Sequence, residues 1–177
     1  GYFGGLVDIG GQRLIEIWSA LPFLYIMILM GSVFGRSFPL LLIIYGIFNW
    51  IGISYYMRAE FLRLRRQPFV ESAKCMGIPT SKIIFRHILP NALVPVITFF
   101  PFSLVGAIGS LAALDYLGFG LPPGSPSLGE LLAQGKANLQ APWLGITAFV
   151  VLAVMLSLLV FIGEAIRDAF DPRKTQQ

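Results

Sequence analysis

The fold is decided by the apolar run at residues 143–163, which reads WLGITAFVVLAVMLSLLVFIG. The run holds 21 residues, and none of them is charged. A helix rises 1.5 Å per residue, so roughly 20 mostly apolar residues are needed to cross the hydrocarbon core of a bilayer. This run is therefore predicted to be a transmembrane helix.

Three further runs of similar character lie at 14–34, 38–57 and 92–114. The whole chain is 56% hydrophobic and only 12% charged, about half the charged fraction of a soluble domain. This composition excludes a soluble globular domain. It predicts an all-α integral membrane protein, a polytopic helical bundle with four transmembrane helices. Pro22, Pro95 and Pro101 are expected to be kinks, because neighbouring helices can satisfy the freed carbonyls.

The lysines and arginines predict the orientation, since they concentrate on the cytoplasmic side of a membrane protein. The cytoplasmic group would be Arg13, Arg58, Arg63, Arg65, Arg66, Lys74, Lys82, Arg86, Arg167, Arg173 and Lys174. Only Arg36 and Lys136 would lie on the other side. Eleven against two predicts that segment 58–90 and both ends of the chain are cytoplasmic, with 115–142 outside. The basic run 63–66 has no interleaved aromatics, so it favours lipid headgroups over nucleic acid.

Residues that would drive transport or catalysis are missing from the spans. No charged side chain lies in the middle of a span, whereas carriers coupled to an ion gradient usually need one. The chain has a single histidine, a single cysteine that is expected to be inert packing (Cys75), and no phosphate-binding GxxxxGK[ST] loop. Energy for transport is therefore expected from another subunit. An ion-driven carrier or channel subunit, or a membrane scaffold, remains the alternative.

Segment 58–90 is predicted to contain two short helices. Pro68 suits the first position of a helix, and Glu71 would complement the positive end of its dipole. Gly77 is placed to end that helix in a left-handed conformation. A second helix is expected from Thr80, as N-cap, until Pro90 stops it.

The first of these helices would carry an apolar stripe. Phe69, Ala73 and Met76 fall on one face at i, i+4 and i+7. Ala73 and Gly77 are also small, so another backbone could approach them. This surface fits a groove in a partner protein, or equally a helix lying on the lipid surface.

The same segment resembles a known loop. Glu71-Ser72-Ala73, then Gly77, then Leu89-Pro90 is similar to the "EAA" loop of permease subunits of bacterial ABC importers. That pattern reads EAA, three residues, Gly, and I-x-LP after nine more. Ser72 replaces the second alanine, and His87 replaces the isoleucine.

Further stretches resemble the dipeptide and oligopeptide branch of that family, in particular its C-type subunit. They are 114–120 (LDYLGFG, near LSFLGLG), 122–129 (PPGSPSLG, near PPxPSxG), 163–173 (GEAIRDAFDPR, near GDxLRDxLDPR) and 2–8 (YFGGLVD). Members of this family have six spans. The resemblance thus implies that this chain holds the last four spans of a longer permease, and the absence of a signal sequence and of an initiator methionine agrees with that expectation.

The resemblance also implies the roles of particular residues. It implies that coupling to an ATPase falls to Phe69, Val70, Glu71, Ala73, Met76 and Gly77. His87, Leu89 and Pro90 would support the loop, and His87 is expected to form hydrogen bonds rather than to act as a ligand or base.

The implied partners are cytoplasmic ATPase subunits that bind ATP and Mg, a related permease forming a heterodimer, an extracytoplasmic binding protein, a peptide and membrane lipid. No cofactor and no nucleic acid is expected for this chain. Its place would be the bacterial inner membrane.

Two features allow two interpretations each. The polar span residues Asn49, Ser54, Thr98 and Ser103 could line a path for a peptide or bond neighbouring backbone. The outer segment 115–142, rich in glycine and proline, is expected to be a set of turns that serves mainly as architecture. It could also contact a binding protein or act as a gate.

Overall fold

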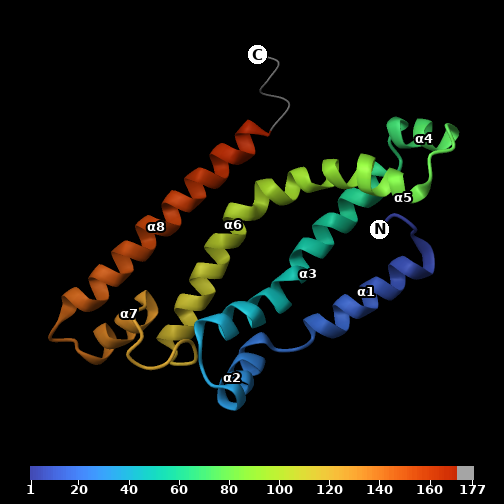
Figure 1. Ribbon diagram of the computed structural model, residues 1–177. Coiled ribbons are helices and arrows are strands. Elements are labelled where there is room, and N and C mark those ends of the chain that lie inside the picture. Colours follow the sequence, from blue (N-terminus) through green and yellow to red (C-terminus); the bar gives the residue numbers. More distant parts are fainter. Residues whose placement is uncertain (171–177) are drawn as a thin grey trace. The chain divides into compact units, whose positions relative to one another are not determined.

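The computed structural model describes residues 1–170, and in this part the regular secondary structure is entirely helical (Figure 1). The helices are α1 (Gly5–Ser19), α2 (Phe23–Phe34), α3 (Phe38–Leu64), α4 (Pro68–Cys75), α5 (Thr80–Lys82), the π-helix η1 (Ile83–Ile88), α6 (Leu89–Tyr116), α7 (Leu128–Ala137) and α8 (Pro142–Ala169). The predicted class, an all-α integral membrane protein, is confirmed. The end of the closing motif, 171–173, lies outside the described residues, as do Arg173 and Lys174.

Three stretches of the described chain are long and apolar enough to cross a membrane: Phe38–Leu64, Thr80–Tyr116 and Pro142–Ala169. A fourth is obtained only if α1 and α2 together count as one broken span. The run 14–34 is thus not the single helix expected. Pro22 is the N-cap of α2, and since proline disfavours a helical conformation in the residue before it, the chain breaks there. Pro95 and Pro101, by contrast, lie inside the continuous helix α6.

The chain forms two compact units, which are described separately. The first comprises Gly1–Leu21 and Phe48–Phe99, and the second comprises Pro22–Ile47 and Phe100 onwards. Helices α3 and α6 each continue from one unit into the other. The first unit holds α1, α4, α5 and η1, and the second holds α2, α7 and α8.

The core of the first unit lies where α3 ends and α6 begins, beside α4 (Figure 1). Its buried residues are Leu64, Val70, Ala73, Ile83, Ile88 and Ala92. Most large apolar side chains of the long helices are exposed instead, among them Phe149 and Phe161 of α8 at 65% each. Such exposure is normal for a surface that faces lipid, and the small core fixes α4 against the helix ends.

The second unit contains a helix that the sequence did not predict. Helix α7 lies within the expected set of turns at 115–142, and Ser127 caps it by accepting a hydrogen bond from the Glu130 N–H at 3.1 Å. Close packing holds its two ends. A Cβ on Gly129 would lie 2.3 Å from the Ala112 carbonyl of α6, and one on Gly135 would lie 2.5 Å from the Gly145 nitrogen of α8. Glycine at these two positions lets α7 pack between the ends of α6 and α8.

Candidate functional site

Helix α4 has well-defined ends, as predicted. Pro68 is its first residue, after the extended N-cap Gln67, and Glu71 lies in the first turn. At the other end Gly77 adopts φ +73°. The Gly77 N–H donates to the Lys74 carbonyl at 3.0 Å, and the Ile78 N–H donates to the Ala73 carbonyl at 3.1 Å. This pair of bonds is the Schellman motif, which needs a left-handed residue and therefore favours glycine.

One face of α4 is buried within this chain. Val70 is fully buried and Ala73 is 2% exposed, both in the core formed with α3, η1 and α6. The stripe expected from Phe69, Ala73 and Met76 is therefore divided: Ala73 anchors α4 to its own chain and offers no surface for another backbone. The sequence alone could not show this, because the partners Ile83 and Ile88 come from the next helix.

Outside the buried Val70 and Ala73, the surface of α4 is open. Phe69 is 41% exposed and Met76 is 71% exposed, and Glu71, Ser72 and Cys75 are exposed as well. A firmly anchored short helix with an exposed phenylalanine and methionine suits insertion into a groove. We call Phe69, Ser72 and Met76 the outer face of α4.

The second helix of the segment differs from its prediction. Thr80 is the first helical residue, and the N-cap is Pro79. Pro90 does not stop the helix, which runs from α5 through η1 into α6 without a break. In η1 the Leu89 N–H bonds to the Ile84 carbonyl, five residues back. This wider turn leaves room for the ring of Pro90, which in a regular α-helix would clash with the carbonyl four residues earlier.

His87 lies in η1, and its side chain is half-buried. Its carbonyl accepts a hydrogen bond from the Asn91 side-chain amide at 2.6 Å. Leu89 is half-buried and Pro90 is exposed. Within residues 1–170, no three histidine, cysteine or acidic residues are grouped as a metal site would require.

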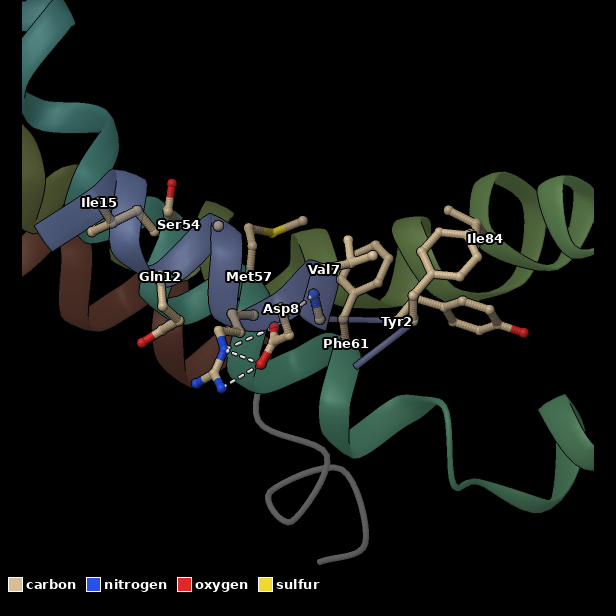
Figure 2. Close-up of a pocket in the computed structure, with 13 residues that line it drawn as sticks. Tyr2, Val7, Asp8, Gln12, Ile15, Ser54, Met57, Phe61 and Ile84 are labelled. Carbon is tan, nitrogen blue, oxygen red and sulfur yellow. Dashed lines mark hydrogen bonds and ion pairs between the residues drawn. The ribbon is translucent and has the colours of Figure 1, made fainter. Parts of the chain in front are cut away.

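The segment before α1 is attached to the same core. The Tyr2 carbonyl accepts a hydrogen bond from Arg65 Nη1 at 3.0 Å, and Lys74 Nζ lies 5.6 Å from the centre of the Tyr2 ring. Further along the chain, Asp8 of α1 contacts Arg58 of α3. Arg58 Nε donates to both carboxylate oxygens of Asp8, each at 3.0 Å. Both residues line a cavity of about 450 Å³ between α1, α3 and η1. Figure 2 shows Asp8 among the lining residues, with dashed lines marking its interactions. In the sequence Arg58 and Arg65 indicate only orientation, and these contacts are not predictable from it, since no local pattern joins residues that lie 50 or more positions apart.

The polar residues of the spans behave differently from one another. Ser54 donates to the Trp50 carbonyl, and Thr98 donates to the Val94 carbonyl, each at 2.9 Å. Both hydroxyls are thus satisfied by their own helix. Asn49 and Ser103 are exposed. A role for these four residues in a translocation path stays a prediction.

The comparison with known proteins identifies the family. Residues 1–176 match the family described as "Binding-protein-dependent transport system inner membrane component". The chain belongs to this family. Its relatives in this family include proteins named "Peptidoglycan transport system permease protein YejE", from Agrobacterium fabrum, and "Inner membrane ABC transporter permease protein YejE", from Escherichia coli K12, each 57% identical. The protein named "Oligopeptide transport system permease protein OppC" of Haemophilus influenzae is 36% identical.

These alignments cover nearly all of this chain but only part of each relative. They span 99%, 98% and 98% of the chain, and 46%, 51% and 56% of the three relatives respectively. The chain thus spans about half the length of the permeases it matches. The resemblance drawn from the EAA-type segment and the later motifs is confirmed at the level of the transport-permease family.

Proposed function

We propose that this chain is the membrane-spanning part of a permease subunit in an ATP-driven importer of peptides, and that α4 is the helix on which cytoplasmic ATPase subunits act. Family membership and the names of the relatives support transport. The anchored α4, with its exposed Phe69 and Met76, supports a docking role. An ion-driven carrier or a scaffold finds no such support.

The proposed orientation places α4 in the cytoplasm of a bacterium, with the permease in the inner membrane. Seven of the thirteen lysines and arginines lie in segment 58–90, against Arg36 and Lys136 on the opposite side. Both ends of the chain would then be cytoplasmic. Helix α7 would lie on the outer side, where a substrate-binding protein delivers the substrate to the permease.

In this proposal the chain hydrolyses nothing and binds no nucleotide. ATP and Mg bind to the partner subunits, and their closure moves the α4 helices of this permease and of a second, related permease. A rigid-body movement of that kind switches a bundle between two states open to opposite sides. The path would run between the two permeases.

The proposed substrates are peptides, including peptides released from peptidoglycan. This proposal rests on the 57% identity to the Agrobacterium protein, whose name specifies peptidoglycan, against 36% to the oligopeptide permease of Haemophilus. Uptake of labelled di-, tri- and longer peptides and of a peptidoglycan fragment, each in competition with the others, tests it. Competition by simple dipeptides alone would argue against this substrate class.

The single observation that carries the docking role is the exposure of Met76 at the end of an otherwise anchored helix. Met76→Glu places a charge on the outer face without touching the core, so the permease should insert normally but lose most of the ATPase that purifies with it. The matched control is Ser81→Glu, which adds the same charge at an exposed position of α5. Equal retention of the ATPase by both variants would contradict the proposal.

A further inference from the structure

Tyr2 lies between α1 and α4, and it contacts its neighbours through both its ring and its backbone. Its ring packs against the core that buries Val70 and Ala73 of α4. The ammonium of Lys74, also on α4, lies over that ring, within the range of a cation–π interaction. The Tyr2 backbone is held separately by Arg65, just after α3.

The connection from Tyr2 into α1 is short and closely packed. Gly4 adopts φ +66°, and a Cβ there would lie 2.9 Å from Arg65 Nη1. Helix α1 begins at the next residue. One turn further on, Asp8 is paired with Arg58 of α3. No flexible linker therefore separates the contacts of Tyr2 from those of α1.

We propose that Tyr2 is a positioning residue: held between Lys74 and the core, its ring makes α1 move with α4. The inference rests on the proposed docking of α4. It adds a route by which a movement of α4, caused by the ATPase subunits, also moves α1. The route is a set of contiguous contacts between packed elements, the physical form that such coupling takes. Since α1 lines the cavity beside Asp8 and Gln12, its movement would change the width of that cavity.

Hydrogen–deuterium exchange on the assembled transporter tests the proposal without any probe attached to the protein. Peptic fragments from 1–16 report on α1, and fragments from 68–78 report on α4. Each would be compared between the nucleotide-free complex and the complex trapped with ATP and vanadate. The variants are Tyr2→Leu, which removes the ring; Tyr2→Phe, which keeps it; and Tyr25→Leu, a matched change at an exposed tyrosine of α2.

In the unmodified transporter we expect trapping to change exchange in both fragments. In Tyr2→Leu the α4 fragment should still respond while the α1 response is lost, and Tyr2→Phe and Tyr25→Leu should behave like the unmodified protein. Lys74→Gln should weaken the α1 response by roughly two- to fivefold, the size expected of an exposed cation–π contact.

Two results would overturn the inference while leaving the docking role intact. One is an α4 response with no α1 response in the unmodified protein, and the other is an unchanged α1 response in Tyr2→Leu. A lack of response in the α4 fragment itself would overturn the docking role, and the inference with it.

Discussion

Arg58 of α3 binds the carboxylate of Asp8 through Nε and Nη2, closing a forked ion pair between residues 50 positions apart. Asp8 is only 12% exposed in this pair. Arg58 is the first residue of segment 58–90, which the orientation rule assigns to the cytoplasm. The pair fixes α1 against α3 within two turns of the end of α3.

The Asp8–Arg58 pair should be required as a pair. Asp8→Asn and Arg58→Met should each lower the melting temperature of the purified permease, because each removes the charge-assisted hydrogen bonds between the guanidinium and a carboxylate that is only 12% exposed. The exchange Asp8→Arg with Arg58→Asp should recover part of the loss. Thermal unfolding in detergent measures the melting temperature of each variant. If the losses caused by Asp8→Asn and Arg58→Met simply add in the variant that carries both, the two residues do not interact.

Gly77 should tolerate no side chain, for conformational reasons. Nothing lies within 4 Å of a Cβ built there, but the residue adopts φ +73°. Gly77→Ala should therefore cost about 1–2 kcal/mol, the strain of an ordinary residue in the left-handed region. Faster hydrogen exchange in α4 would measure the loss.

The control for Gly77 is Gly52→Ala in helix α3, where a Cβ again meets nothing within 4 Å and φ is not left-handed. In a helix interior this change should stabilise by roughly 0.5–1 kcal/mol. Equal effects of the two substitutions would contradict the conformational argument.

Ala73 should respond to added volume, unlike its neighbour Ser72. Ala73→Leu overfills the core beside Ile83 and Ile88 and should destabilise the docking of α4 on its own chain by about 1–3 kcal/mol. Ser72→Leu adds a comparable volume on the exposed face and should leave that core unchanged. Proteolysis of segment 67–80 in the membrane is the measurement; equal sensitivity of the two variants would count against the observed burial.

Gly135 of α7, in the second unit, should be similarly intolerant of an added side chain. Its Cβ would lie 2.5 Å from the backbone nitrogen of Gly145. Gly135→Ala should therefore separate α7 from α8 and lower stability by about 1–3 kcal/mol. Gly106→Ala in α6, where no atom lies within 4 Å, is the control. Thermal unfolding that ranks the two variants alike would argue against the close approach.

Most of the fold is predictable from the sequence, because only a few kinds of secondary structure can cross a bilayer. Apolar runs of about 20 residues indicate helices, since lipid forces every backbone group to bond within its own segment. The ends of α4 were also predictable, as Pro68 and Gly77 have local conformational reasons for their places. The break at Pro22 was underestimated as a kink, and α7 was missed because glycine and proline in its neighbourhood indicated turns.

The candidate site was predicted in its position but not in its packing. The periodicity of α4 alone does not say which of its faces binds its own chain. That depends on Ile83 and Ile88, whose placement follows from η1, and no pattern of residues signalled a π-helix before Pro90. The contacts of Tyr2 and Asp8 could not be predicted from the sequence for a similar reason. They join segments that are distant in the chain and produce no periodic pattern of residues.

The central claim is that the outer face of α4 contacts a nucleotide-hydrolysing subunit, and Met76 is the position that reports on it most directly. A photoreactive side chain at Met76, activated in the assembled transporter within its native membrane, should cross-link to an ATPase subunit, and more efficiently with ATP trapped than without nucleotide. Cross-links to lipid alone, in both states, would contradict the account.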